Sequence, residues 1–310
     1  MLHIVPNYYK SFSCIASACR HNCCIGWEID IDADTDAYYS TVPAPFGNRL
    51  KQHISHKGEA HFILGSEERC PFLNEKNLCD IICTLGEAHI CTICQEHPRF
   101  HNELPGRIES GLGLCCEEAA RLILQQTVPM LLEADGTDPS NTDEIIALRD
   151  QVLFCLQNRT QSIPARIDAM LTLCSAQPLH ADMPQWADFL LSLERLDEQW
   201  TNCLLLLKHH AANTDISGFD VHMAQRQTEY EQLLVYFVYR HLANACDETD
   251  LAARASFSAF SYKLLHMLGA VLWTTHGTFS FADQVELARL YSSEIEYSDE
   301  NLDALLDALC

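Results

Sequence analysis

The sequence predicts a mainly α-helical protein, in which a small cysteine-rich module that binds metal packs on an all-helical C-terminal bundle. Two observations lead to this fold class. Eleven of the sixteen cysteines lie before residue 117. From residue 117 onward, apolar side chains instead recur at the three- and four-residue spacing of long amphipathic helices. We therefore expect a metal or iron–sulfur module at residues 1–116 and a helical domain at residues 117–310.

The bulk composition indicates a globular protein and excludes one class of partner. The chain has 310 residues, of which 48% are hydrophobic and 20% are charged. Its net charge of −23 argues against nucleic acid as a partner, because binding to a phosphate backbone needs a basic surface. Such an acidic chain suits basic or lysine-bearing partners instead.

The N-terminal part shows only short structural patterns. Residues 27–32 (WEIDID) alternate between apolar and polar side chains as a strand does, and residues 61–64 (HFIL) are also compatible with a strand. Residues 79–91 have the composition of a short helix. We therefore expect this part to depend on its cysteines more than on long helices or strands.

The C-terminal part is expected to be a bundle of helices. Phe189, Leu193, Leu196 and Trp200 follow one helical stripe, and Tyr230, Leu233 and Phe237 follow another. The pattern predicts helices over residues 117–133, 143–158, 164–176, 185–211, 221–246, 251–275 and 281–309. The later cysteines, Cys155, Cys174, Cys203, Cys246 and Cys310, are expected to be core or incidental residues, since a free cysteine packs as a small hydrophobe.

No targeting or membrane-spanning segment is evident. The longest strongly apolar stretch, residues 264–273 (LLHMLGAVLW), is too short to cross a bilayer and contains His266. The N-terminus has no uninterrupted apolar run of the kind found in signal peptides. We therefore expect a cytoplasmic protein, in which clustered cysteines favour metal binding or catalysis over disulfides.

The early cysteines form short-range clusters that are typical of metal ligation. Cys19 precedes the vicinal pair Cys23 and Cys24, and Cys91-x2-Cys94 is half of a four-thiolate site. A further cluster comprises Cys70, Cys79 and Cys83. Zinc and an iron–sulfur cluster fit this spacing equally well, so the pattern alone does not choose between them.

Other catalytic signatures are absent from the sequence. The C-x3-C-x2-C loop of radical S-adenosylmethionine enzymes is not completed, because glycines occupy the required third positions, 26 and 86. The chain has neither a phosphate-binding G-x-x-x-x-G-K-[ST] motif nor an H-E-x-x-H motif. A thiol oxidoreductase built on Cys91-x2-Cys94 is also disfavoured, because the surrounding sequence does not suggest a βαβ unit.

Three segments in the first 125 residues resemble the flagellin lysine-N-methylase family. They are FSCIASACRHNCCIGWEIDID, CPFLNEKNLCDIICTLGEAHICTICQEHPRF and CCEEAARLIL, and they occur in the family's order. Glu117 replaces the proline that commonly follows the last cysteine of the third segment. No motif of the family is matched in the helical remainder. The cysteines matched as metal ligands are Cys14, Cys19, Cys23, Cys24, Cys70, Cys79, Cys91 and Cys94.

The resemblance implies a bacterial cytoplasmic enzyme that methylates lysine side chains of flagellin. It further implies S-adenosylmethionine as the methyl donor and a [4Fe–4S] cluster held by the cysteines, with zinc as the alternative metal. A second reading needs only the thiols, and it is a non-catalytic zinc- or iron-binding module with a helical docking domain. Neither reading predicts an oligomeric state, a catalytic residue or a donor-binding residue.

Acidic and aromatic residues beside the first cysteine cluster are candidates for attracting a lysine and a sulfonium cation. They are Tyr8, Tyr9, Trp27, Glu28 and Asp30, although core packing or solvent exposure is their commoner role. The acidity is greatest in the helical part. Residues 117–310 have a net charge of −18 and residues 1–116 of −5. Such a helical surface suits a lysine-bearing partner, and it is equally typical of an ordinary solvated bundle.

Overall fold

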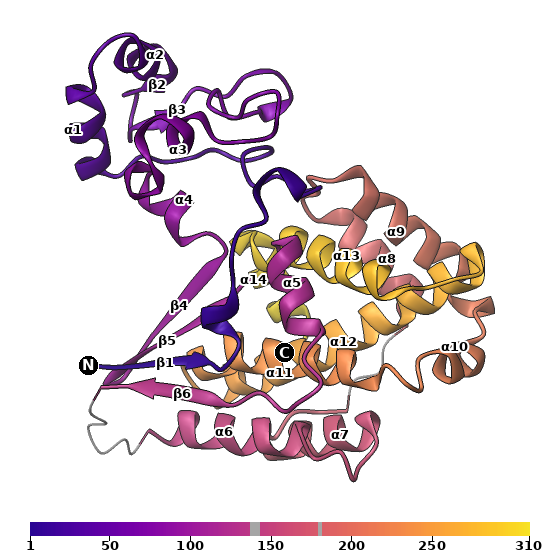
Figure 1. Cartoon of the computed structure of the whole chain (residues 1–310). Coiled ribbons are helices and arrows are strands. Elements are labelled where there is room, and N and C mark those ends of the chain that lie inside the picture. The colour runs from indigo at the N-terminus through magenta and orange to yellow at the C-terminus, as the bar shows by residue number, and fades with distance from the viewer. Residues whose placement is uncertain (137–142, 179–181) are drawn as a thin grey trace. The chain divides into compact units, whose positions relative to one another are not determined.

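The computed structural model describes residues 1–136, 143–178 and 182–310, and the chain is mainly helical, as predicted (Figure 1). The chain divides into two compact units. We call residues Ser13–Phe100 the thiol unit, and Met1–Phe12 together with His101–Cys310 the helical unit. The division differs from the expected boundary after residue 116, because the first twelve residues and residues 101–116 belong with the helices.

A four-stranded sheet, which the sequence patterns did not predict, brings distant parts of the chain together. Its order is β4-β5-β1-β6, with β1 at Leu2–Pro6, β4 at Arg99–Leu104, β5 at Arg107–Leu112 and β6 at Leu132–Asp135. β1 pairs in parallel with β5 and antiparallel with β6. Each strand has only four to six residues, so its alternation is too short to identify from sequence.

Most helices of the helical unit begin at a residue whose side chain caps the first turn. Aspartate or serine side chains accept a backbone N–H at the start of α6–α10 and of α12–α14, which satisfies one of the otherwise unpaired donors of a first turn. The helices are α5 Glu117–Leu124, α6 Glu144–Leu156, α7 Ile163–Leu173, α8 Met183–Ser192, α9 Glu198–His210, α10 Ile216–His222, α11 Gln227–His241, α12 Glu248–His276, α13 Phe281–Tyr291 and α14 Asp299–Ala308.

Four of the predicted helices are shorter or divided. The helix expected over 117–133 ends at Leu124, and residues 132–135 instead form β6. The helices expected over 185–211, 221–246 and 281–309 are each interrupted by new caps or turns. In the last of these, Ser292–Glu296 adopts a π-helix between α13 and α14. Apolar periodicity continued across these breaks, so it did not reveal them.

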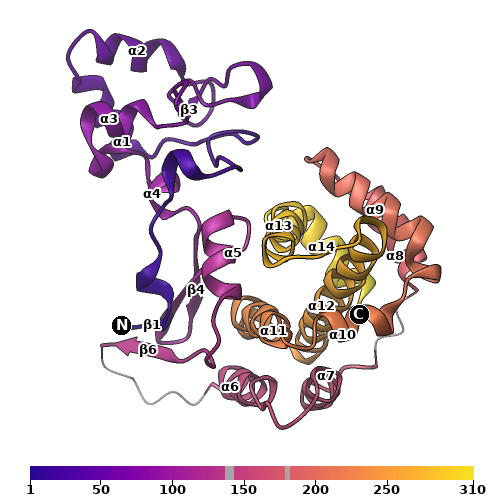
Figure 2. The same ribbon diagram turned by 45° about the vertical axis from the view of Figure 1, so that its right-hand side comes forward.

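The core of the helical unit is centred on α11 and α12. In α11, every residue from Tyr230 to Tyr239 is buried. Most residues of α12 between Leu251 and Val271 are also buried. α11 packs against α5, α6 and α12, and Figure 2 shows these helices surrounding it. A helix that is buried on all sides is expected at the centre of a bundle.

The thiol unit consists of short elements. Its α-helices are α1 Ala33–Thr41, α2 Phe46–His53, α3 Asp80–Leu85 and α4 Thr92–Glu96, and its two-stranded sheet pairs β2 Ile54–Ser55 with β3 His61–Phe62. The strand expected over residues 27–32, all of which are described, does not form; single bridges join Ile25 to Arg69 and Asp30 to His61. The short strand and short helix expected near residues 61 and 79 appear as β3 and α3.

The core of the thiol unit includes some of its cysteines. Its buried residues are mostly aliphatic and aromatic, among them Tyr39, Phe62 and Phe72. Cys70 and Cys91 are buried within this cluster, and the partly buried Cys24, Cys79 and Cys94 pack against it. The hydrophobic core therefore positions the cysteine side chains directly.

Candidate functional site

Two cysteines of the thiol unit lie at the first turns of helices. Cys79 is the N-cap of α3, and Cys91 is the N-cap of α4. Burial raises the pKa of Cys79, and the nearby backbone N–H groups of Ile81 and Ile82 act in the opposite direction. The backbone near Cys94 likewise contributes to the lowered pKa of Cys91, after the bond with the Cys94 thiol. Backbone donors aimed at a sulfur stabilise its thiolate form, which is the form that ligates metal.

Cys91 and Cys94 form a close pair of thiols. Their sulfur atoms lie 3.3 Å apart, because a spacing of three residues places both side chains on one helical turn. The hydrogen bond between the thiols lowers the pKa of Cys91 and raises that of Cys94. The pair is therefore arranged to share one proton, with Cys91 as the more acidic partner.

Cys23, Cys24 and Cys70 form a second group of thiols. The backbone N–H of Cys70 donates to the Cys24 carbonyl at 2.8 Å, which holds the two segments together. The Cys24 thiol shares hydrogen bonds with both Cys23 and Cys70. These bonds lower the pKa of Cys23 to about 7 and also lower that of Cys70, whereas the pKa of Cys24 is raised.

The two groups lie close enough to influence each other electrostatically. Negative charge on Cys23 and on Cys70 contributes to the raised pKa of Cys94, after its bond with Cys91 and its burial. Burial is the main cause of the raised pKa of Cys79, with smaller contributions from Cys70 and Cys83. Six predicted ligands, Cys23, Cys24, Cys70, Cys79, Cys91 and Cys94, are thus neighbours in the thiol unit.

The described side chains do not form a metal-binding geometry. Within residues 1–136, 143–178 and 182–310, no three His, Cys, Asp or Glu side chains are grouped as ligands of one metal ion. The other two predicted ligands make local contacts: the exposed Cys14 sulfur accepts the Ala16 N–H at 3.4 Å, and the Cys19 thiol donates to the His21 carbonyl at 3.1 Å. The prediction that all eight cysteines bind metal therefore remains a prediction.

Polar contacts fix the segments that contain these thiols. Asp32 caps α1 through the Thr35 N–H and also accepts the Thr92 N–H and hydroxyl at 2.8 and 3.0 Å, so it joins α1 to α4. Burial acts against ionisation of Asp32, but the bonds from Thr92 and Thr35 outweigh it and lower its pKa to about 2. This carboxylate therefore stays charged and orients the turn that contains Cys91 and Cys94.

Two ring side chains lie beside the vicinal cysteines. The Trp27 indole donates to the Cys23 carbonyl at 2.5 Å, and its ring lies 6.1 Å from that of His97. Burial lowers the pKa of His97 to about 4, so its imidazole is neutral at pH 7. Trp27 and the neutral His97 thus form an uncharged ring pair next to Cys23.

The acidic and aromatic candidates are divided between the two units. Glu28 and Asp30 are exposed in the thiol unit, as their commoner role predicts, whereas Trp27 packs against the thiol unit's core. Tyr8 and Tyr9 belong to the helical unit, where Tyr8 is buried.

Sequence reasoning missed a buried polar network in the helical unit. Glu296, in the π-helix, is fully buried and bonds to His241 Nε2 at 2.6 Å, to the Tyr236 hydroxyl at 3.1 Å and, as an ion pair, to Arg240 at 3.6 Å. Burial acts to raise the pKa of Glu296, but Arg240 and His241 outweigh it, so that the pKa is lowered. A π-helical turn often marks a functional or strained position, and nothing in the sequence identified this one.

Cys115 and Tyr297 form a second contact that the sequence did not predict. Burial raises the pKa of Cys115 to about 12, although a hydrogen bond from Tyr297 partly opposes this. The Tyr297 hydroxyl lies so close to Gly113 that a Cβ at that position would collide with it. Gly113 is therefore required for close packing, and Cys115 is a protonated thiol at neutral pH.

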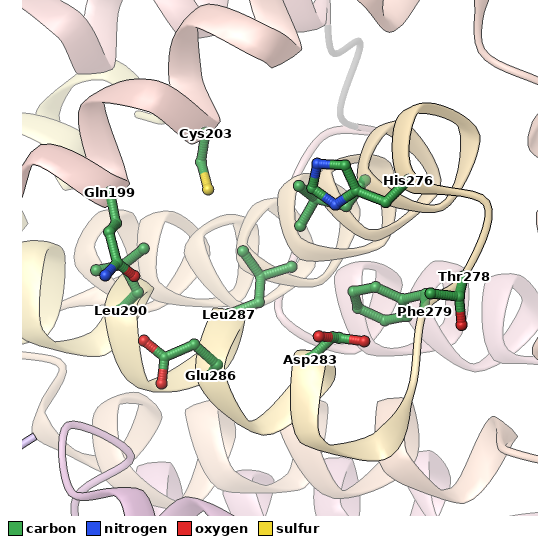
Figure 3. Close-up of a pocket in the computed structure, with 10 residues that line it drawn as sticks. Gln199, Cys203, His276, Thr278, Phe279, Asp283, Glu286, Leu287 and Leu290 are labelled. Atoms are coloured by element: carbon green, nitrogen blue, oxygen red, sulfur yellow. The ribbon is translucent and has the colours of Figure 1, made fainter. Parts of the chain in front are cut away.

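A small groove in the helical unit contains both apolar and acidic side chains. It has a volume of about 170 Å³ and lies between α9, the end of α12 and α13. Leu287 and Phe279 line it, and the carboxylates of Asp283 and Glu286 lie beside them on α13, opposite Cys203 of α9 (Figure 3). The sequence analysis treated Cys203 as a core residue, and it is partly buried at the groove.

Two further findings concern the chain as a whole. All sixteen cysteines are described, and every one is a free thiol. Across the part of the chain that the structure describes, every helix is too short or too polar to span a bilayer.

Comparison with known proteins gives matches in one group of proteins. Residues 179–309 match the family model described as the FliB lysine N-methylase C-terminal domain. The chain is 34% identical over 165 residues to the lysine-N-methylases of Salmonella typhimurium (strain LT2) and Salmonella choleraesuis, covering 49% of this chain and 40% of each relative. It is also 34% identical over 137 residues to the flagellar biosynthetic protein FliU of Salmonella muenchen, covering 41% of this chain and 79% of that protein.

The matches to the lysine-N-methylases cover only part of those proteins. The chain spans about 40% of the length of the two lysine-N-methylases that it matches. The family-model match lies in the helical part, where sequence reasoning found no motif, whereas the recognised cysteine segments lie outside it. No solved structure matches the chain.

Proposed function

The chain belongs to the FliB lysine N-methylase family, and from this membership we propose that it transfers methyl groups to lysine side chains of a protein. The observation that supports the proposal most strongly is the combination of 34% identity to lysine-N-methylases with the family-model match over residues 179–309. The acidic helical part supports it further, because a lysine-bearing partner is positively charged.

We propose S-adenosylmethionine as the methyl donor. A lysine amine attacks the methyl carbon with its lone pair, the N–C bond forms as the sulfonium S–C bond breaks, and the amine releases a proton. Because lysine has a pKa of about 10.4 in water, the amine must lose a proton before it can attack. Burial of the side chain in an apolar site lowers that pKa and favours the neutral amine.

We further propose that the thiol unit contains a cysteine-ligated metal centre, with a [4Fe–4S] cluster as the leading candidate and zinc as the alternative. Six thiols that influence one another electrostatically, with lowered pKa values at Cys70 and Cys91, fit thiolate ligation in their donor chemistry. When bound, an iron–sulfur cluster supplies a cross-link among its ligands and one-electron redox chemistry. Asp32, Trp27 and His97 would orient and shield that centre.

We propose flagellin as the substrate and the bacterial cytoplasm as the compartment. Two matched relatives are named lysine-N-methylases, and a third is named a flagellar biosynthetic protein. The free state of all sixteen cysteines is compatible with a reducing compartment.

The proposed activity is tested by co-producing the chain with flagellin and measuring the intact mass of the flagellin. We expect mass increases in steps of one methyl group that disappear when the chain is omitted. Peptide mapping should place the added methyl groups on lysines. Flagellin of unchanged mass would contradict this substrate assignment.

The metal proposal is tested by iron, sulfide and zinc analysis of protein purified without oxygen, together with its visible absorption spectrum. Near-equal iron and sulfide with a brown colour would support the cluster, and zinc alone would support a structural site. The observation that supports the alternative, a non-catalytic metal module, is the concentration of the thiols in one compact unit. Tight binding of S-adenosylmethionine in calorimetry would argue strongly against that alternative.

A further inference from the structure

The groove between α9, α12 and α13 has an apolar floor. Leu272, Phe279, Leu287 and Leu290 line it, and of these Phe279, Leu287 and Leu290 are almost fully buried. Its volume of about 170 Å³ corresponds to a few water molecules at ~30 Å³ each. Small-molecule and cofactor sites are usually larger, at ~300–1,000 Å³, so the groove suits a single extended side chain better than a nucleotide-containing methyl donor.

The rim of the groove is negatively charged. Asp283 and Glu286 line it, and among its ten lining residues none is a lysine or an arginine. Arg289 pairs with Glu286 at 2.7 Å and lies 3.8 Å from Asp197, so this cation faces two carboxylates, and Asp283 adds a third negative charge at the groove. The net charge around the groove is therefore negative.

The negative charge near the groove contributes to the raised pKa of the Cys203 thiol. Burial raises its pKa to about 11, and the charges of Asp197 and Glu286 raise it further. Carboxylates that disfavour a thiolate at this position favour a cation there by the same Coulomb interaction. The small apolar interior of the groove and the negative charge at its rim therefore both suit an aliphatic side chain that ends in a positive group.

We propose that this groove receives a lysine side chain of a protein partner, with the methylene stem against Leu287 and Phe279 and the ammonium group beside Glu286 and Asp283. The inference rests on the proposed function, since it identifies where a lysine-bearing substrate would dock. All ten lining residues lie within the region that matches the family model. Lysine stems commonly cover apolar surface while their charged ends stay near water.

The test follows leucine methyl signals of the full-length chain by NMR during titration with the peptide acetyl-Gly-Gly-Lys-Gly-Gly-amide. We expect saturable shifts at Leu287 and Leu290 that are at least about fivefold weaker in apparent affinity when norleucine replaces lysine, because norleucine lacks the ammonium group. Equal binding of both peptides, or no shift at either leucine, would overturn the proposal.

Two variants separate charge from shape. Glu286→Gln should weaken lysine-peptide binding about two- to fivefold, as expected for loss of a partly exposed charge pair. Cys203→Leu should fill the groove and abolish the leucine shifts. Asp307→Asn, an exposed carboxylate on α14, is the matched control and should bind as the parent chain does. Thermal unfolding of each variant confirms that the fold is retained.

The outcome is independent of the methylation assay. Methylated flagellin without leucine shifts would reject the groove and leave the proposed activity intact. Leucine shifts that are specific for lysine, with flagellin mass unchanged, would support the groove and count against the proposed activity.

Discussion

The thiol unit and the helical unit stabilise their folds in different ways. The longest α-helix of the thiol unit has nine residues, whereas α12 of the helical unit has 29. Isolated helices shorter than ~12–15 residues are marginal in water, so short helices depend on tertiary contacts and caps. In the thiol unit, those contacts include cysteines at helix starts and a carboxylate that joins two helices.

The helical unit instead compensates its buried charges with other side chains. Glu109 and Arg149 form a fully buried two-bond ion pair, and Glu231 pairs with Arg166. Such pairs need no external ligand, because donor and acceptor are both present in the chain. The difference suggests that stability of the thiol unit depends on the occupancy of its thiols, whereas stability of the helical unit does not.

The largest expected effect comes from replacing Cys91 and Cys94 with serine together. If these thiols bind metal, the double variant should lose metal, and amide hydrogen exchange should become rapid throughout residues 13–100 while the helical unit stays protected. Structural metal sites contribute as much as ~10–16 kcal/mol in small metal-dependent modules. The matched control is Cys155→Ser with Cys310→Ser, and unchanged exchange in the Cys91/Cys94 variant would contradict the comparison.

The second effect is expected at Glu296 in the helical unit. Glu296→Gln leaves the largely buried Arg240 without its charged partner, so we expect the free energy of unfolding to fall by about 3–5 kcal/mol. Urea unfolding followed by circular dichroism measures this. The exposed Glu300→Gln should change stability by less than about 0.5 kcal/mol. Equal effects of the two substitutions would show that the buried network contributes little.

A smaller effect is expected at Asp32 in the thiol unit. Asp32→Ala removes the acceptor for the N–H groups of Thr35 and Thr92, and capping losses of this kind cost about 1–2 kcal/mol. Hydrogen exchange at these two amides should accelerate. Asp34→Ala, an exposed residue in the same first turn of α1, is the control. Slow exchange at Thr92 in the Asp32 variant would show that Asp32 does not fix α4.

The smallest effect is a change in pH dependence. Burial lowers the pKa of His241, and the nearby Arg240 and Arg254 also lower it, against the opposing bond from Glu296. The unfolded chain, whose histidine has a pKa of about 6.5, therefore binds a proton before the folded chain does, and stability falls as the pH decreases below that value. Because Glu296 has a lowered pKa, its own contribution to stability is lost only at more acidic pH, below about 4.3.

His241→Gln should flatten the dependence of unfolding free energy on pH between 7 and 5.5. The exposed His209→Gln serves as the control and should keep the slope of the parent chain. A slope that is unchanged in the His241 variant would assign the acid sensitivity to another group.

The mainly helical fold was predictable because several long apolar stripes repeat at helical spacing. The sheet was not, since β1 is five residues long and its partner β5 lies about 100 residues further along the chain. Helix boundaries were also missed where apolar periodicity continued through a break, as between Ser192 and Glu198.

The sequence indicated that the thiols cluster, and metal binding by them stays a prediction. Short cysteine spacings indicated a thiol cluster, and the structure brings six of the eight predicted residues near one another. The network around Glu296 left no sequence signal, because a glutamate in an acidic helical segment looks solvent-exposed until its π-helical turn directs it inward. The groove likewise requires three helices to meet, which periodicity within each helix does not reveal.

The position of β1 affects the order in which the chain can fold during synthesis. β1 pairs with β5 and β6, so it has no strand partner until the ribosome has added residues 107–135. The thiol unit is continuous in sequence, so all of it is synthesised after β1 and before β5 and β6. We expect the first strand to remain unpaired on the ribosome while the thiol unit folds, so chaperone binding to nascent chains should be strongest before residue 135 has left the exit tunnel.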